Sequence, residues 1–211
     1  MFPIGLYVPT RGHVWHQTAS ALGHFNPIYV RCNTGVADAR STIVAQFLES
    51  DAKVLVMCDD DVVPPEGWTK VVSHVQLGRT DVCAAVVPIC LEHSVFLPNV
   101  FERNDSLPKG YQLNAEFLRK EGVEEVDAVG TGLIAIHRRV LEDKRMKGCF
   151  LADMSKGKGE DVLFCERAKK ARYKISVDFD IWCDHMTLVH ANGVANAYME
   201  IVNRVSRESE A

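Results

Sequence analysis

An apolar segment that ends abruptly in three carboxylates constrains this chain most. Residues 53–58 (Lys-Val-Leu-Val-Met-Cys) have the β-branched, apolar character of a strand buried on both faces of a parallel sheet. Asp59, Asp60 and Asp61 follow directly, and prolines at 64–65 then prevent the strand from continuing. If the chain stays extended, Asp59 and Asp61 point to one side and Asp60 to the other. Ligands of open α/β sheets bind beyond the carboxyl ends of the strands, so this cluster is a candidate site.

The acidic cluster has a functional and a simpler interpretation. Three adjacent carboxylates repel one another, which favours protonation of at least one of them unless a cation lies nearby. Their oxygen atoms suit a hard divalent ion such as Mg²⁺ or Mn²⁺. The simpler interpretation is a solvated acidic turn without a ligand. The position at the end of a buried strand favours the functional one.

The composition indicates a globular protein of one domain, with or without a small appendage. The 211 residues are 47% hydrophobic and 25% charged, which is ordinary for a soluble protein. Lys and Arg number 24 against 28 Asp and Glu, and this net charge of −4 argues against a dedicated nucleic-acid binder. No segment has the length of a membrane span, and residues 1–4 lack the basic start of a signal peptide. Seven cysteines without a Cys-x-x-Cys pair favour a reducing cytoplasm.

The order of segments predicts a mostly parallel sheet with helices on both faces. Apolar strand-like segments alternate with segments of helical periodicity as far as about residue 88, which is the pattern βαβαβαβ. Strands are expected at 3–8, 27–32, 53–58, 81–88 and 174–182, and a strand-like segment at 126–136 is interrupted by glycines at 130 and 132. Helices are expected at 13–24, 36–50, 64–77, 138–144, 160–172 and 193–205. Between 90 and 125 we expect long loops with at most a hairpin, and such loops are usually functional.

His185 is a candidate metal ligand because it follows the strand expected at 174–182. With Asp61 it would form a pair of protein ligands that leaves open positions for oxygens of a substrate. A single histidine is more often structural or exposed than a ligand. The remaining candidates have no such place at a strand end and are expected at the surface: His13, His16 and His190.

Glu160 and Asp161 open a predicted helix after a glycine-containing loop at 154–159. Acidic residues in a first helical turn stabilise free amide groups and the helix dipole, and this alone is a sufficient explanation. The functional alternative is a general base on a rigid helix start. The same dipole would keep that base ionised.

Two arginines near the first strands allow two interpretations. Thr10 and Arg11 follow the first strand, and Arg40 lies in the otherwise apolar start of the second helix. Either arginine is a solvated surface charge, or it reaches a phosphate or a base ring.

Together these segments resemble the glycosyltransferases of the GT-A fold, and most closely the family 2 group. In the N-terminal half, residues 8–11 (Val-Pro-Thr-Arg) resemble the nucleotide-binding start of that family. Residues 39–41 resemble its Ala-Arg-Asn segment, and residues 55–62 resemble its Asp-x-Asp motif. In the C-terminal half, residues 127–132 with 138–139 resemble the family's glycine-containing segment beside the donor sugar. Residues 159–161 resemble its Glu-Asp motif, and residue 185 resembles its metal-binding histidine. Ser41 replaces the usual Asn, and residues 90–125 match nothing in the family.

The resemblance implies a nucleotide-sugar donor, with a UDP-sugar favoured, and Mn²⁺ or Mg²⁺ held by Asp61 and His185. The metal would offset charge on the departing diphosphate. Asp161, with Glu160 beside it, would take the proton from an acceptor hydroxyl, through an oxocarbenium-like transition state. The implied donor-binding residues are Pro9, Thr10, Arg11, Arg40, Asp59 (nucleoside), Asp60 (sugar hydroxyls) and Gly132.

The same resemblance implies one catalytic domain over residues 1–205. Residues 1–90 would bind the nucleotide-sugar, 91–192 would hold the acceptor and catalytic residues, 193–205 would form a C-terminal helix, and 206–211 would be a frayed tail. The acceptor stays open between a glycan, a lipid carrier, a protein and a modified nucleobase, as does the oligomeric state; Asp161 favours inversion. A core of this size resembles those of bacteria and their phages, which predicts action in the cytoplasm.

Two other functions remain. A sugar nucleotidyltransferase would share the sheet and the metal carboxylates, but it usually carries a glycine-rich loop with Arg after its first strand, and residues 9–12 contain one glycine. A non-catalytic module that binds nucleotide-sugars would need neither metal ligands nor a base.

Overall fold

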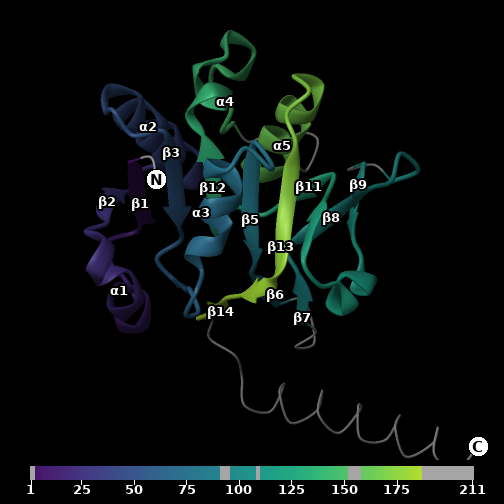
Figure 1. Ribbon diagram of the computed structural model, residues 1–211, viewed down its shortest axis with the longest axis horizontal. Helices are drawn as coiled ribbons and strands as arrows, with labels where there is room; N and C mark the ends of the chain where they lie inside the picture. The colour runs from purple at the N-terminus through teal and green to yellow at the C-terminus, as the bar shows by residue number, and fades with distance from the viewer. Residues whose placement is uncertain (1–2, 91–95, 108–109, 152–157, 187–211) are drawn as a thin grey trace, which may run out of the picture.

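A seven-stranded sheet runs through the molecule in the order β10-β13-β5-β12-β3-β1-β2 (Figure 1). The structure is a computed structural model that describes residues 3–90, 96–107, 110–151 and 158–186. Five of the seven strands are parallel to one another, which confirms the predicted mostly parallel sheet. They are β1 (Ile4–Thr10), β2 (Ile28–Arg31), β3 (Val54–Cys58), β5 (Val82–Val86) and β13 (Ile175–Trp182).

Two strands run in the opposite direction. β12 (Leu133–His137) lies between β3 and β5 and is antiparallel to both, and β10 (Val123–Glu125) lies at the edge beside β13. The βαβαβαβ pattern predicted the mostly parallel sheet but did not indicate that β12 would lie between β3 and β5. An apolar run shows that a strand is buried on both faces, but it does not show which strands flank it.

Helices cover both faces of the sheet, as predicted (Figure 1). α2 (Val36–Glu49), α4 (Arg138–Glu142) and α5 (Glu160–Lys170) pack into one core, and α1 (His16–Leu22) and α3 (Thr69–Gln76) into the other. Side chains of β3 alternate between these cores, with Leu55 and Met57 in the first and Val54, Val56 and Cys58 in the second. All five are 0% exposed, so the strand is buried on both faces as expected.

The described residues between 90 and 125 form more β structure than expected. β8 (Val100–Arg103) is the middle strand of a three-stranded sheet, and β6 (Pro88–Cys90) pairs with β7 (Phe96–Pro98). The region also contains β9 (Tyr111–Leu113) and a 3-10 helix η3 (Ala115–Arg119). The third strand of the small sheet is β11 (Ala128–Val129), which follows this region in the chain. The prediction of long loops is wrong because strands of two to four residues are too short to show a period.

Element boundaries also differ from the predicted ones. Pro9 and Thr10 belong to β1 rather than to a loop, and proline is tolerated there because pairing of β1 with β3 ends at Tyr7. α1 begins at His16 and is followed by a 3-10 helix η1 (Gly23–Phe25), and α3 begins only at Thr69. Among the described residues no helix combines the length and apolar character needed to cross a membrane. The expected C-terminal helix at 193–205, the tail at 206–211 and His190 lie outside the described residues.

Candidate active site

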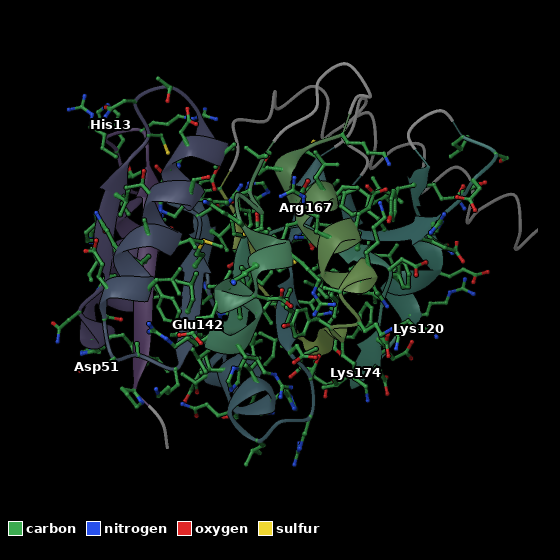
Figure 2. All side chains as sticks on the ribbon, turned by 90° about the horizontal axis from the view of Figure 1, so that it is seen from above. His13, Asp51, Lys120, Glu142, Arg167 and Lys174 are labelled. Atoms are coloured by element: carbon green, nitrogen blue, oxygen red, sulfur yellow. The ribbon has the colours of Figure 1, made fainter. Side chains whose placement is uncertain are left out.

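The carboxyl ends of the parallel strands meet at one edge of the sheet, and the site residues follow them. Arg11 follows β1, Asp59 follows β3, and His185 follows β13 in the short strand β14 (Asp184–His185). Figure 2 shows His13, beyond the end of β1, and Asp51, before the start of β3, at opposite ends of the sheet. This edge is where open α/β sheets bind ligands.

The three aspartates lie on a turn rather than on an extended strand. β3 ends at Cys58, and the Val62 amide at the start of β4 (Val62–Val63) donates to the Asp59 carbonyl at 3.2 Å. The Asp59 amide donates to the Gly132 carbonyl at 2.8 Å, which joins this turn to the loop before β12. The expected alternation of side chains therefore does not apply, and each carboxylate faces a different partner.

Asp59 forms part of a buried ion-pair cluster. Arg40, on α2, is 3% exposed, and its Nη2 donates to both oxygens of Asp59 at 2.7 and 2.9 Å. Its Nη1 donates to Glu160 at the start of α5, and its Nε has no partner among the described residues. Burial raises the pKa of Asp59, and Arg40 opposes that rise only in part. The surface interpretation of Arg40 is excluded.

Asp61 faces His185. β14 pairs with β4, and this places His185 Nε2 3.4 Å from Asp61 Oδ2. His185 Nδ1 lies 2.7 Å from the Pro88 carbonyl, which can only accept, so Nδ1 carries a proton. The hydrogen bond to Asp61 raises the pKa of His185 against the effect of burial. Burial alone would raise the pKa of Asp61, but the hydrogen bond and charge of His185 outweigh it and lower this pKa.

This pair fits a divalent cation in its donor chemistry. A carboxylate oxygen and an imidazole nitrogen are both ligands of Mn²⁺. A carbonyl that holds the other ring nitrogen is the usual partner of metal-binding histidines, because it fixes the tautomer and the ring orientation. No group of three His, Cys, Asp or Glu side chains able to hold a metal occurs within the described ranges. A cation here would therefore take its remaining ligands from substrate and water.

Asp60 ties the acidic turn to the loop after β1. Its Oδ2 accepts from the Arg11 amide at 3.1 Å, and its carbonyl accepts from the Trp15 amide at 3.0 Å. Thr10 shapes the same loop, because its hydroxyl donates to the His13 carbonyl and accepts from the Gly12 amide. The Arg11 side chain stays exposed beside the cluster.

Glu160 and Asp161 occupy the first turn of α5. Asp161 Oδ1 accepts from the Val162 amide at 2.7 Å, as the helix-start interpretation expects. Both side chains also line a cavity, as the general-base interpretation requires. Burial and the charge of Glu160 raise the pKa of Asp161. We expected the helix dipole to dominate the ionisation of this carboxylate, and it does not.

Two adjoining cavities collect these side chains. One of about 280 Å³ contains the acidic turn, another of about 340 Å³ contains Asp161 and His185, and both are lined by Arg11, Val36 and Asp59. Every site residue predicted from the sequence, except Thr10, lines one of these cavities. These residues are Pro9, Arg11, Arg40, Asp59, Asp60, Asp61, Gly132, Glu160, Asp161 and His185.

Several lining residues were not predicted. Asn99 is 4% exposed, and its Oδ1 accepts from the Val87 amide at 2.9 Å, which supports the wall of the larger cavity. It lies in the region that showed no pattern. The other lining residues that were not predicted are Trp15, Cys32, Val36, Val62, Val87, Ile89 and Phe101. His13, expected at the surface, is exposed but lines the smaller cavity.

Comparison with known proteins identifies the fold. The crystal structure of A197 from STIV matches with a TM-score of 0.62 at 23% identity, over 88% of this chain and 86% of that one. GalNAc-T7 with UDP, GalNAc and Mn²⁺ matches with a TM-score of 0.63 at 11% identity, over 90% of this chain and 45% of that one, so this chain spans less than half its length. No protein-family model and no curated protein sequence matches. The arrangement of sheet, helices and strand-end site is the GT-A fold, the fold of glycosyltransferases, as the sequence resemblance implied.

Proposed function

We propose that the protein is a metal-dependent glycosyltransferase that moves a sugar from a nucleotide-sugar, in the first instance a UDP-sugar, to an acceptor hydroxyl. One observation carries the proposal. Adjoining cavities bring Asp61 and His185, a pair whose donor atoms suit a divalent cation, close to a half-buried carboxylate, Asp161. The fold shared with GalNAc-T7, whose structure holds UDP and Mn²⁺, supports these classes of donor and cation.

The donor would lie along the acidic turn. Arg40 Nη2 occupies one lone pair on each oxygen of Asp59, which leaves further lone pairs to accept from ribose hydroxyls. The exposed Arg11 side chain lines both cavities and suits a diphosphate. Asp60, with Oδ2 held by the Arg11 amide, keeps Oδ1 for sugar hydroxyls.

Asp61 and His185 would hold Mn²⁺ or Mg²⁺. Bound there, the cation supplies Lewis-acid stabilisation of the departing diphosphate. The protein's part is to present Asp61 Oδ2 and His185 Nε2 on the same side, and the pairing of β4 with β14 does this. The Pro88 carbonyl keeps the proton of His185 on Nδ1, away from the cation.

Asp161 would act as the general base. Its Oδ1 is held by the Val162 amide, so Oδ2 is the oxygen that takes the proton of the acceptor hydroxyl. Burial raises the pKa of Asp161, and a carboxylate with a raised pKa is a stronger base. Glu160 is committed to Arg40, which leaves the proton transfer to Asp161. A base that activates the acceptor directly gives a single displacement with inversion.

One assay separates the proposed function from its alternatives. Purified protein is incubated with Mn²⁺ and a panel of sugar-nucleotides, and free nucleoside diphosphate is measured. Release of UDP or GDP from one donor supports transfer or its hydrolytic side reaction. Pyrophosphate production would instead indicate a nucleotidyltransferase. Donor binding by calorimetry without any release would indicate a binding module.

Two variants test the assigned roles. Asp61→Ala should lose metal-dependent donor binding in calorimetry, because one of two protein ligands is gone. Asp161→Asn should keep donor binding and lose about 10²- to 10⁴-fold in turnover, because the amide cannot take a proton. The control is Asp51→Asn, because Asp51 is exposed and lies at the opposite end of the sheet (Figure 2). This variant should change neither donor binding nor turnover. Normal binding of donor and Mn²⁺ by Asp61→Ala would refute the metal assignment.

A further inference from the structure

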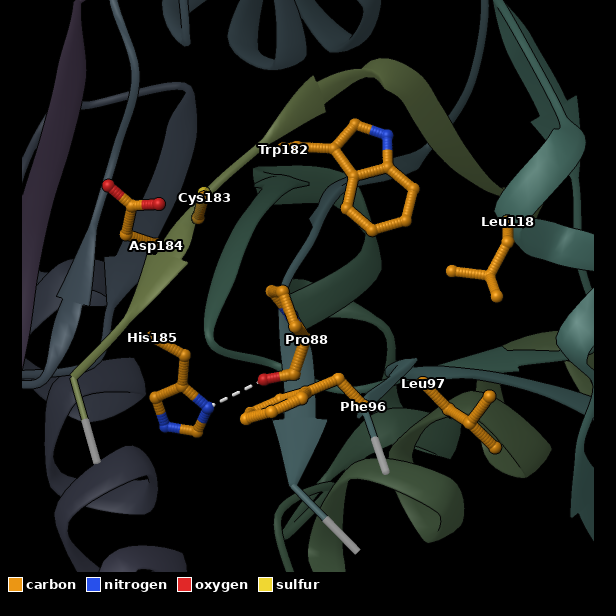
Figure 3. A pocket seen from close by; sticks show the side chains of 8 residues that line it. All are labelled: Pro88, Phe96, Leu97, Leu118, Trp182, Cys183, Asp184 and His185. Atoms are coloured by element: carbon orange, nitrogen blue, oxygen red, sulfur yellow. Dashed lines mark hydrogen bonds between the residues drawn. The ribbon is translucent and has the colours of Figure 1, made fainter. Parts of the chain in front are cut away.

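An apolar cavity adjoins the candidate active site at His185. Its volume is about 240 Å³, and His185 lines both this cavity and the larger one of the candidate active site. Figure 3 shows Trp182 and Leu118 at one side of it, His185 at the other, and Pro88 and Phe96 between them. The remaining lining residues are Leu97, Cys183 and Asp184.

The lining is apolar except where it approaches the active site. The Trp182 indole Nε1 donates to the Phe179 carbonyl at 2.8 Å, so this ring has no free donor for a ligand. The Phe96 and Leu118 side chains are 44% and 49% exposed, and neither contributes to the buried cores. The polar side chains of the lining are those of Asp184 and His185, on β14. A molecule that fits this cavity has an apolar body and a polar end.

The strands that form the apolar cavity also position His185 of the candidate active site. Pro88, in β6, lines the cavity, and its carbonyl holds His185 Nδ1 at 2.7 Å. β7, which supplies Phe96 and Leu97, pairs with β6. His185 therefore lines both the apolar cavity and the one that contains Asp161, so a group in the apolar cavity would lie beside a residue of the candidate active site.

We propose that this cavity binds the apolar part of the acceptor: an aryl or alkyl group attached to the moiety whose hydroxyl receives the sugar. This inference rests on the proposed function. A bare sugar would leave most of its hydroxyls without partners against Leu97, Leu118 and Phe96, and unpaired polar groups are unfavourable in such surroundings. The volume is below the usual range for whole drug-sized ligands, so it suits one ring or a short alkyl chain.

Matched glycosides of one sugar test this directly. Methyl, phenyl and octyl β-glucosides are added to the full-length protein with Mn²⁺ and UDP, and binding is followed by saturation-transfer-difference NMR. We expect the phenyl and octyl glucosides to bind more tightly than the methyl glucoside, with the strongest transfer to aryl or alkyl protons. Equal binding of all three, or no binding of the phenyl and octyl glucosides, would overturn the proposal. The second result includes the case in which residues of the chain itself fill the cavity.

A pair of leucine variants locates the site. Leu118→Asp places a charge in the cavity and should weaken phenyl-glucoside binding about tenfold or more. Leu107→Asp is the control, because Leu107 is 40% exposed and lines none of these cavities. Equal effects of the two variants would place the bound glycoside elsewhere and overturn the proposal.

Failure of the subsite and failure of the proposed function give different results. Mn²⁺-dependent UDP binding and donor hydrolysis without an acceptor do not involve Leu118, so Leu118→Asp should leave both unchanged. If UDP binds but the glucosides do not, the subsite is refuted and the proposed function stands. If UDP does not bind, the proposed function fails, whatever the glucosides do.

Discussion

Three aspartates that are adjacent in sequence have three different environments. Asp59 is held by Arg40, Asp60 accepts from the Arg11 amide, and Asp61 faces His185. The pKa of Asp59 is raised by burial and that of Asp61 is lowered by His185. The sequence showed that three like charges need compensation, but the partners come from segments far apart in the chain. Their roles differ because their partners differ, and only the fold reveals those partners.

Arg40 should be the residue of this cluster on which stability depends most. Arg40→Met removes the shared partner of Asp59 and Glu160, whose side chains are 27% and 14% exposed. Breaking a buried pair from one side costs about 3–5 kcal/mol, and we expect about 3 kcal/mol because Asp59 keeps some contact with water. Urea unfolding measures the loss. The additional change Glu160→Gln should restore part of it, because one unpaired charge is then removed.

Arg11→Met is the matched control, because Arg11 has the same charge but is exposed. It should change the free energy of unfolding by no more than about 0.5 kcal/mol. Equal unfolding midpoints for Arg40→Met and Arg11→Met would show that the cluster contributes nothing to stability.

The rise of turnover with pH on the acidic side of the pH–activity profile (its acid limb) should reflect the ionisation of Asp161. A base must be ionised, so turnover should rise with pH through the pKa of Asp161, which burial and Glu160 raise above the usual range. Glu160→Gln removes the neighbouring negative charge and leaves Arg40 less neutralised. Both effects lower the pKa of Asp161, so the limb should move to lower pH. The measurement is UDP release at saturating Mn²⁺ as a function of pH.

Glu166→Gln is the control for this shift. Glu166 lies in the same helix, pairs with Lys158 and is not among the groups that chiefly shift the pKa of Asp161. Its acid limb should stay where the wild-type limb is. A limb that moves in neither variant, or equally in both, would show that it does not report Asp161.

At the scale of elements, long periodic segments were predictable and short ones were not. The start of α2 and that of α5 were predicted to the residue, because α2 shows a sustained period and α5 begins after a glycine loop. β8 and β9 have four and three residues and show no period. The place of β12 between β3 and β5 is set by pairing partners, and partners leave no local trace in the sequence. Asn99 escaped prediction for the same reason, since its role depends on the loop before β12.

That loop should be intolerant of added bulk. A Cβ at Gly130 would lie 2.6 Å from Asn99 Nδ2 and 3.1 Å from Asn99 Cβ. Asn99 cannot move freely, because it is buried and its Oδ1 accepts from the Val87 amide. Gly130→Ala should therefore destabilise the fold by about 2 kcal/mol, the cost of breaking a buried hydrogen bond. Chemical denaturation measures the change.

Gly23→Ala is the matched control for this position. Gly23 has φ −53° and ψ −33°, and a Cβ there meets no atom within 4 Å. Alanine should stabilise by about 0.4–1 kcal/mol, because the unfolded chain loses freedom. If Gly130→Ala behaves like Gly23→Ala, Asn99 is not held as the structure indicates.

At the scale of the whole molecule, the candidate cation-binding pair, Asp61 and His185, lies apart from the buried cores of the fold. Two cores on the two faces of the sheet contain the buried apolar side chains, including Phe47 and Phe164 in one and Leu22 and Val75 in the other. Asp61 and His185 lie outside both cores, with 37% and 27% of their side chains exposed. A cation held by two protein ligands at the edge of the sheet adds nothing to either core, so stability of the fold should be independent of it.

Metal removal tests this separation. Dialysis against EDTA should leave the Tm of the protein nearly unchanged, unlike a structural metal site, where the binding energy is folding energy. Adding Mn²⁺ and UDP together should raise Tm, by an amount that corresponds to about 2.7 kcal/mol when the ligand is at a hundredfold of its Kd. UDP alone should raise it much less, and His185→Ala should remove the difference. A large fall in Tm on EDTA treatment would mean that the fold itself requires the cation. An equal rise in Tm with UDP in the presence and absence of Mn²⁺ would mean that the nucleotide binds without the cation.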